Sequence, residues 1–312
     1  EPPYLNHIAQ LVNLSRIRNA GLNIAVDSMH GAGSKYFAKL IEGGTSKVVE
    51  IRDEYNPSFP NMIQPEPIEK NLRPLIDFME DSLYDVGLAT DGDADRLGLI
   101  DEDGNYISTL QTFSLICRHL LENLEMKGPI IKSITMTNVI NKLGELHDVE
   151  VIDTPVGFKY LCPVMMEENA IAAGEESGGY GFAGHIPERD GLLSGLMILD
   201  LMSITQLNPS DLIEQLEEMV GVYHYDRHDI EFNEQDREKT LLRLTDSKFE
   251  SVGDLKVVSI DNRDGLKLNL EEDSWALIRL SGTEPLIRIY AEASTSDQVE
   301  KIIANCSKIV GK

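Results

Sequence analysis

An alternation of strand-like and helix-like segments in the first hundred residues constrains the fold more than any other feature. Short apolar runs predict three buried strands, at residues 22–26, 47–51 and 86–89. Apolar residues at helical spacing predict the segments between them as helices, at residues 31–42 and 72–81. Strand, crossover helix and strand form the repeating unit of parallel sheets. Residues 1–110 are therefore predicted to form one α/β domain.

The rest of the chain predicts two further domains. Residues 111–218 repeat the alternation, with strands at 130–134, 149–152 and 170–173 and helices at 111–124, 138–146, 159–169 and 192–204. In residues 219–312 strands follow one another directly, which favours antiparallel pairing. They are predicted at 223–232, 256–260, 266–270 and 275–280, with helices at 234–245 and 296–310. The predicted fold class is α/β, with two consecutive mixed-sheet α/β domains followed by a smaller α+β C-terminal domain.

The charge of the chain limits its partners. Its formal net charge is −25 at pH 7, whereas nucleic acids and anionic membranes bind proteins through basic surfaces. We therefore expect neither as a partner. No apolar run approaches the roughly 20 residues that a membrane-spanning helix needs. Three widely separated cysteines, a small and odd number, favour a reducing compartment and predict a cytoplasmic protein.

Three aspartates, Asp91, Asp93 and Asp95, alternate directly after a predicted buried strand. Their charges repel one another unless a counter-ion binds them, and hard divalent cations bind carboxylate oxygens. Three protein ligands leave open coordination positions, which suits Mg²⁺ holding a phosphate oxygen. Arg96 adds a planar set of donors that suits a phosphate group. The loop is therefore a candidate Mg²⁺ site.

Two other interpretations of this acidic loop stay open at this stage. Counted from Asp91, Glu102 is the twelfth residue, as in an EF-hand calcium loop. However, Arg96 stands at the sixth position, where that loop needs glycine, and a strand precedes the loop in place of a helix. The second alternative is an acidic hairpin turn that binds no ligand. The next acidic turn, residues 101–105, is predicted to be such a hairpin.

A glycine-rich loop, residues 174–181, follows the predicted strand at 170–173. Dense glycines indicate close backbone approach or unusual dihedral angles. Glu175 and Ser177 stand two residues apart, so that a carboxylate and a hydroxyl can hydrogen-bond to neighbouring hydroxyls of a sugar. The alternative is a surface loop with incidental polar groups.

Two basic residues flank the glycine-rich loop in the sequence. Arg189 precedes a predicted helix, where it could contact phosphate or pair with Glu188 or Asp190. Lys159 lies in a turn that leads into a helix. A phosphorylated substrate would need local positive charge in so acidic a chain. We therefore treat Arg96, Arg189 and Lys159 as candidate catalytic residues.

Residues 279–288 predict a phosphate-binding loop between two strands. Hydroxyls, exposed amides and arginines together bind phosphate dianions, and this segment contributes Arg279, Ser281, Gly282, Thr283 and Arg288. Strand alternation is expected to place both arginines on one face. Glu284 is unusual beside an anion and could orient an arginine. The alternative is a polar hairpin turn.

In order and spacing these three loops resemble those of the α-D-phosphohexomutase superfamily, which includes phosphoglucomutases and phosphomannomutases. The resemblance covers nearly the whole chain and implies phosphohexomutase-type domains. It implies that the three aspartates bind Mg²⁺ and that Glu175 and Ser177 select the sugar. It also implies that residues 279–283, with Arg288, hold the phosphate that does not react. Residues 27–31 resemble a strand end of the family's second domain and are predicted to be structural.

The resemblance also implies a reaction and its partners. A phosphoserine in the family's first domain gives its phosphate to a hexose phosphate and forms a hexose 1,6-bisphosphate, whose other phosphate returns to the serine. No segment here matches that serine region. We therefore expect a fragment that lacks the first domain, its natural partner, and that is inactive alone. Weak Mg²⁺ binding is expected too, because the serine phosphate that would bind the ion is missing.

The substrate and the subgroup are less constrained. Gly179 stands where several bacterial members carry a histidine. The glycine-rich loop looks closest to bacterial phosphoglucomutase and phosphomannomutase, and less like phosphoglucosamine mutase, so glucose or mannose phosphate is the expected substrate. Two alternatives stay open: a non-catalytic sugar-phosphate-binding protein and a calcium-binding structural module.

Overall fold

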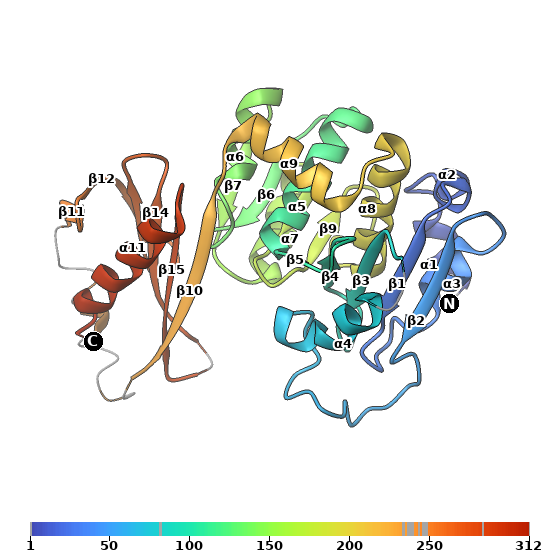
Figure 1. Ribbon diagram of the computed structural model, residues 1–312. Coiled ribbons are helices and arrows are strands. Elements are labelled where there is room, and N and C mark those ends of the chain that lie inside the picture. The colour runs from blue at the N-terminus through green and yellow to red at the C-terminus, as the bar shows by residue number, and fades with distance from the viewer. Residues whose placement is uncertain are drawn as a thin grey trace.

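The computed structural model is a succession of three units, coloured blue to cyan, green to yellow and orange to red in Figure 1. The second unit lies between the first and the third. This arrangement confirms the predicted fold class of two mixed α/β units and an antiparallel α+β unit. The structure describes residues 2–80, 83–232, 235, 240–242, 244, 249–282 and 284–311.

The first sheet has the strand order β2-β1-β3-β4-β5. β1 pairs in parallel with β2 and β3, whereas β3 with β4 and β4 with β5 are antiparallel, so the sheet is mixed. All three predicted strands are present. The strands span Asn23–Asp27 (β1), Lys47–Ile51 (β2), Val86–Thr90 (β3), Leu97–Ile100 (β4) and Tyr106–Ile107 (β5).

Two crossover helices cover opposite faces of this sheet. Ile24 and Val26 of β1 share a hydrophobic core with α3, whereas Ala25 packs with α4 on the other face, as strand alternation requires. The predicted helix from residue 31 was too long, because turns precede it and Lys35 has a φ angle of +67° at its N-cap. The helices span Tyr36–Ile41 (α3) and Glu69–Glu80 (α4).

The second sheet repeats the layout of the first. Its order is β7-β6-β8-β9, with β6 parallel to β7 and β8, and β9 antiparallel at the edge. The residues of β6 again alternate, so that Ile130 packs with α6 and Ile131 with α7. The strands span Ile130–Ser133 (β6), Val151–Thr154 (β7), Ala172–Gly174 (β8) and Tyr180–Phe182 (β9), and the helices Val139–His147 (α6) and Phe158–Glu167 (α7).

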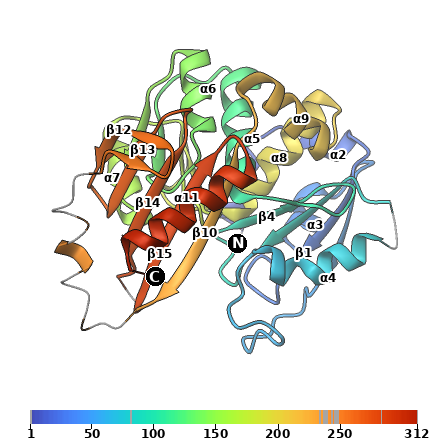
Figure 2. The ribbon, with the colours of Figure 1, turned by 60° about the vertical axis from the view of Figure 1, so that its left-hand side comes forward.

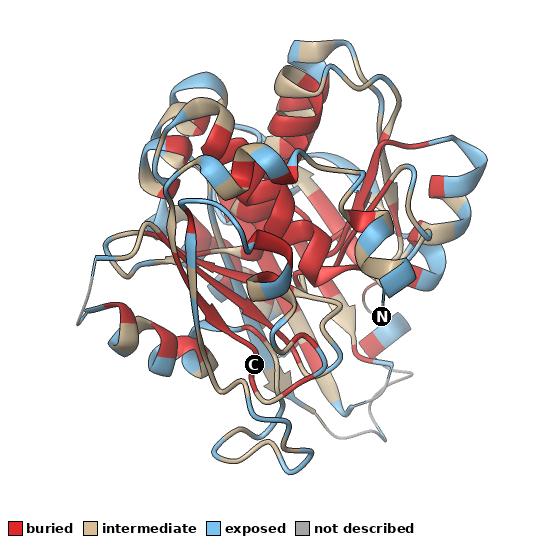
Figure 3. Ribbon diagram, turned by 90° about the vertical axis from the view of Figure 1, so that its right-hand side faces the viewer, coloured by how far each residue is buried: buried red, intermediate tan, exposed pale blue. Residues whose placement is uncertain are grey.

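The first two units share one hydrophobic core, where buried residues concentrate in Figure 3. The almost wholly buried helix α8 lies in this core, and a Cβ added to its Gly195 would lie 2.5 Å from the ring of Phe37. Among the described residues no single helix is long and apolar enough to cross a membrane; α8 and α9, bent by 82°, meet those criteria only as a pair. The remaining helices of these units are Pro2–Ile8 (α1), Leu14–Asn19 (α2), Thr109–Arg118 (α5), the π-helix His119–Asn123, Gly191–Thr205 (α8) and Pro209–Val220 (α9).

The third unit is an antiparallel sheet of order β10-β15-β14-β13-β12-β11, with α11 lying across it (Figure 2). Val299 and Ile302 of α11 pack on Ile289 of the sheet. Most of the helix predicted at residues 234–245 lies outside the described residues. The elements span His224–Glu231 (β10), Ser251–Val252 (β11), Leu255–Asp261 (β12), Leu266–Leu270 (β13), Trp275–Leu280 (β14), Leu286–Ala293 (β15) and Ser296–Ile309 (α11).

A small apolar cluster joins the third unit to the second. Ile134 contacts Trp275, which is fully buried and is the only tryptophan of the chain. The buried Lys267 donates a hydrogen bond of 2.9 Å to the carbonyl of Ile134, and its ammonium lies 4.3 Å from the centre of the Trp275 ring. Burial, and then the charge of Lys132, lower the pKa of Lys267 to about 7. We therefore expect this lysine to make the stability of the interface depend on pH.

Replacing Lys267 by methionine should flatten the pH dependence of stability above neutrality. Because its pKa falls from 10.5 to about 7 on folding, the unfolded chain holds more protons between these values, so the free energy of unfolding rises with pH. The slope of the free energy of unfolding against pH should be smaller in K267M than in wild type, by no more than about 1.4 kcal/mol per pH unit. Urea unfolding from pH 7 to 10 measures it, with K256M at the exposed Lys256 as the control. Equal slopes for wild type and K267M would contradict the pKa shift.

Candidate functional site

The acidic loop joins β3 to β4 at the carboxyl end of β3. The turn after β1 contacts it on one side, where Ala32 donates a hydrogen bond of 3.0 Å to the carbonyl of Gly92. A Cβ on Gly31 would lie 2.6 Å from that same oxygen, so the approach requires glycine. On the other side, the amide of Gly191, the first residue of α8, donates a hydrogen bond of 3.0 Å to the carbonyl of Ala94. Both contacts fix the loop between the first two units.

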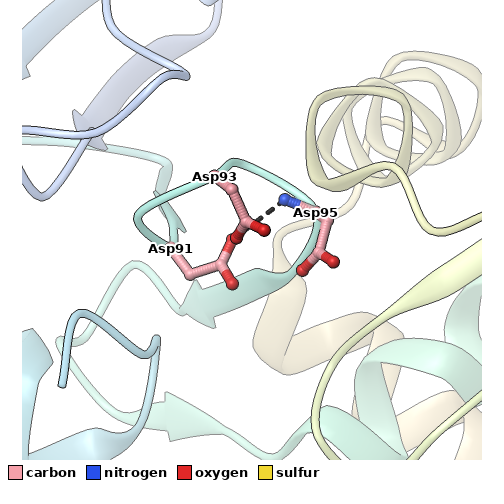
Figure 4. Close-up of side chains that lie close together, drawn as sticks. All are labelled: Asp91, Asp93 and Asp95. Carbon is pink, nitrogen blue, oxygen red and sulfur yellow. Dashed lines mark hydrogen bonds between the residues drawn. The ribbon is translucent and has the colours of Figure 1, made fainter. Parts of the chain in front are cut away.

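The three aspartates converge in this loop, as Figure 4 shows. One carboxylate oxygen from each of Asp91, Asp93 and Asp95 lies within 4.8 Å of the others. The buried Asp91 accepts hydrogen bonds from the amides of Asp95, at 2.9 Å, and Arg96, at 3.0 Å. Because β3 and β4 flank the loop and pair with each other, it is a strand hairpin, which rules out a helix–loop–helix calcium site.

The charges of the triad are poorly compensated by the protein. Burial, and then the charge of Asp95, raise the pKa of Asp91 to about 8. Burial also raises the pKa of Asp95, although Arg189 opposes that shift. The buried Oδ1 of Asp95 has no hydrogen-bond partner. An all-oxygen donor set with excess negative charge fits Mg²⁺, which the three aspartates would hold.

Arginines occupy the space beside the triad. Arg96 pairs with Glu66 of the long loop before α4, at 2.8 Å, and lies 3.5 Å from Asp91. Arg189 pairs with Asp95 at 2.7 Å and lies 3.7 Å from Glu175 of the glycine-rich loop. Arg189 thus joins the acidic loop to the glycine-rich loop.

The sequence offers Glu188 and Asp190 as possible ion-pair partners of Arg189, and the structure shows the first of these pairs. Nε of Arg189 lies 3.4 Å from a carboxylate oxygen of Glu188. Asp190 instead caps α8, where its carboxylate accepts 2.8 Å from the amide of Leu193. The sequence did not indicate the pairing with Asp95, because the partners stand 94 residues apart.

The glycine-rich loop lies directly against the acidic loop. The amide of Leu97 donates a hydrogen bond of 3.0 Å to the carbonyl of Gly178, and Arg96 forms an isolated antiparallel β-bridge with Gly179. Burial raises the pKa of Glu175, and the charge of Arg189 and the backbone amide of Gly157 oppose that rise. Ser177 is half-buried. The two loops therefore form one wall of polar groups.

A side chain at Gly179 would collide with the side chain of Arg189. A Cβ there would lie 2.2 Å from Cδ of Arg189. Replacing Gly179 by alanine should therefore displace Arg189 and lower the free energy of unfolding by about 1–3 kcal/mol. Urea unfolding measures the loss, and Gly282→Ala is the control, since a Cβ on Gly282 meets nothing within 4 Å. Equal stability of G179A and G282A would contradict this contact.

Lys159 is the candidate that the structure does not bring to the others. It is exposed at the start of α7, with its ammonium 5.0 Å from the centre of the Tyr160 ring. Within the described ranges, no ion pair or hydrogen bond joins its side chain to either loop. The backbone amide of the nearby Gly157, however, influences the carboxylate of Glu175 and opposes the rise in its pKa.

The predicted phosphate loop joins β14 to β15. Arg279 and Arg288 are directly opposite each other in the sheet, so both side chains lie on one face. Arg288 pairs with Glu284 at 2.6 Å, so Glu284 does orient an arginine. Ser281 is buried and Gly282 is exposed. Thr283 lies outside the described residues.

Two residues that sequence reasoning missed link the phosphate loop to the second unit. Arg227 of β10 lies 3.3 Å from Glu176 of the glycine-rich loop and 2.9 Å from Asp229, which lies 3.7 Å from Arg288. Asp264 pairs with Arg279 at 2.8 Å. No motif marks either residue, because Glu176 stands 51 residues from Arg227 and Arg279 stands 15 residues from Asp264.

Comparisons with known proteins agree with this arrangement. Models of the phosphoglucomutase/phosphomannomutase family match residues 2–104 (alpha/beta/alpha domain II), 109–219 (alpha/beta/alpha domain III) and 240–308 (C-terminal domain). The chain is 30% identical to a phosphoglucomutase/phosphomannomutase of Thermococcus kodakarensis, over 96% of this chain and 63% of the relative. It is 32% identical to a probable phosphoglucosamine mutase of Methanosphaera stadtmanae, over 90% of this chain and 59% of the relative.

A solved structure of a phosphomannomutase-like protein from Thermus thermophilus superposes with a TM-score of 0.84 and 28% identity, over 99% of this chain and 65% of that chain. The chain thus spans less than two thirds of the length of these proteins. Three consecutive family domains account for most of its residues. The chain therefore belongs to the phosphoglucomutase/phosphomannomutase family.

Proposed function

We propose that this chain is the metal-, sugar- and phosphate-binding part of a Mg²⁺-dependent phosphohexomutase that interconverts hexose 1-phosphate and hexose 6-phosphate. The observation that carries the proposal is the junction at Arg189, which contacts Asp95 of the acidic loop and Glu175 of the glycine-rich loop. A metal site and a sugar site joined in this way can present a hydroxyl group next to a bound cation.

Each group of side chains has a distinct role in this proposal. Asp91, Asp93 and Asp95 hold Mg²⁺, whose charge would stabilise the oxygens of a phosphate during transfer. Glu175 and Ser177 orient the sugar by hydrogen bonds to its hydroxyls. Arg96, Arg189 and Lys159 are the proposed catalytic residues, whose positive charges would stabilise the reacting phosphate.

The remaining phosphate binds to the third unit in this proposal. Arg279 and Arg288 hold it by charge-assisted hydrogen bonds, together with Ser281, Gly282 and Thr283. Because the sheet places the two guanidinium groups on one face, both can contact one dianion. Binding one phosphate firmly while the other reacts lets a bisphosphate turn over within the same site.

The proposed substrates are glucose or mannose phosphates, with the hexose 1,6-bisphosphate as intermediate. The names of the relatives support a hexose phosphate but do not favour one sugar, since a probable phosphoglucosamine mutase matches as well as a phosphoglucomutase/phosphomannomutase. The net charge of −25 supports the absence of nucleic acid and membrane partners. Free cysteines support a cytoplasmic location.

The reacting serine belongs, in this proposal, to a separate N-terminal domain that completes the site. The chain alone should then bind substrate without converting it. Calorimetry with glucose 6-phosphate and mannose 6-phosphate, in the presence of Mg²⁺, tests binding, and a coupled assay tests turnover. Failure to bind either sugar phosphate would sink the proposed function. Binding with turnover would instead refute only the need for an external serine.

A further inference from the structure

We propose that Asp264 is a positioning residue that couples the phosphate-binding Arg279 to the sugar-binding loop. Asp264 lies in the turn between β12 and β13, in the third unit. The inference rests on the function proposed for Arg279 and adds to it a connection between the phosphate site and the sugar site. No motif in the sequence marks this aspartate.

One oxygen of Asp264 serves two units at once. Its Oδ2 accepts a hydrogen bond of 2.8 Å from Nε of Arg279 and another of 2.9 Å from the amide of Val156 in the second unit. The next residue, Gly265, has a φ angle of +103°, and a Cβ there would lie 2.5 Å from a backbone oxygen of β14. The turn is therefore held in one conformation beside Arg279.

The amide from which Asp264 accepts a hydrogen bond is adjacent in the chain to one that influences the carboxylate of Glu175. Val156 donates to Asp264, and the backbone amide of the following residue, Gly157, opposes the rise that burial causes in the pKa of Glu175. Glu175 in turn faces Arg189, which pairs with Asp95 of the metal loop. The backbone of Val156 and Gly157 thus lies between the Asp264–Arg279 pair and the Glu175–Arg189–Asp95 contacts of the sugar and metal sites.

A second contact docks the same turn on the second unit. The guanidinium of Arg263 donates to the carbonyl of Asp153, at the end of β7, and pairs with Asp261 at 2.9 Å. Trp275 lies fully buried in the nearby cluster that joins the two units. Because it is the only tryptophan, its fluorescence reports on this interface alone.

Asp264 could affect phosphate binding either by positioning Arg279 or by repelling the phosphate, and these two accounts predict opposite effects on affinity. A carboxylate beside an anion site repels a phosphate dianion, so an electrostatic account predicts tighter phosphate binding when Asp264 is removed. The guanidinium is a planar fork of five N–H groups, and a bond to Nε fixes the direction of the others. A positioning account therefore predicts weaker binding, which is the opposite sign.

The test compares Asp264→Ala, Asp264→Asn and Asp254→Asn with the wild-type chain. Asp254 is exposed in the turn between β11 and β12 of the same unit, so D254N matches the loss of charge. Calorimetry with glucose 6-phosphate should show roughly tenfold to hundredfold weaker binding for D264A. D264N keeps an acceptor oxygen and should recover part of the affinity, whereas D254N should bind normally. Acrylamide should quench Trp275 more readily in D264A.

The outcomes distinguish this inference from the function on which it rests. If the wild-type chain binds no sugar phosphate, the proposed function fails first and this inference fails with it. If the wild type binds but D264A binds as well or more tightly, only the role of Asp264 is overturned. Increased quenching of Trp275 with unchanged affinity would also overturn it, because Asp264 would then hold the interface alone.

Discussion

Replacing Asp93 by asparagine should raise the stability of the metal-free chain and at the same time remove its response to Mg²⁺. Asp93 is exposed, and its charge raises the pKa of both Asp91 and Asp95. In the described residues no ion pair compensates it. Relief of this repulsion should raise the free energy of unfolding by at most about 1 kcal/mol, a value typical of exposed charge pairs.

The same substitution removes one of three charged ligands, so Mg²⁺ affinity should fall on the order of a hundredfold. The wild-type affinity itself is expected to be weak, with a dissociation constant on the order of 0.1–1 mM, because three carboxylates and water would be the only ligands. Binding to the folded state alone stabilises it in proportion to the logarithm of Mg²⁺ concentration. D93N should lose that gain.

Urea unfolding with EDTA and with excess Mg²⁺ measures both effects. Asp103→Asn is the matched control, because Asp103 is an exposed aspartate in the neighbouring acidic turn of the same unit. D103N should keep the full Mg²⁺ response. A D93N chain that Mg²⁺ stabilises as much as wild type would show that the triad is not the site, and micromolar affinity of the wild type would contradict the expected weak binding.

The strands and the acidic loop could be predicted because their signals are local. The predicted strand Lys47–Ile51 matches β2 residue for residue, and the triad follows a buried strand as expected. Helix α9 was missed although Asn208 and Pro209 form a recognisable start signal, an N-cap followed by proline at the first helical turn. That miss was one of interpretation, since the information was in the sequence.

The partners of the arginines could not be predicted, because no local pattern specifies them. Arg96 pairs with Glu66, 30 residues earlier, and Arg227 meets Glu176, 51 residues earlier. Such pairs depend on how the units pack, and a chain with many carboxylates offers many alternatives for each arginine. The sequence therefore indicated the arginines near the predicted loops but not the carboxylates that hold these arginines in place.

Replacing Arg52 by methionine should cost about 3–5 kcal/mol of unfolding free energy, because it leaves a buried carboxylate without its counter-charge. Asp27, at the end of β1, is fully buried, and its two oxygens accept from the guanidinium of Arg52, at 2.8 Å for Nε. The same guanidinium donates a hydrogen bond of 2.9 Å to the carbonyl of Asn71 in α4. This supports the structural role predicted for residues 27–31.

The exposed pair of Arg73 and Asp77 provides the contrast, since its 2.6 Å separation is as short but both side chains face solvent. R73M should cost less than about 1 kcal/mol. The double variant D27N/R52M removes the uncompensated charge and should recover most of the loss in R52M. Equal losses in R52M and R73M would show that burial of Asp27 does not set the cost. A large loss only in R52M would show that the strand end supporting the metal loop depends on this buried pair.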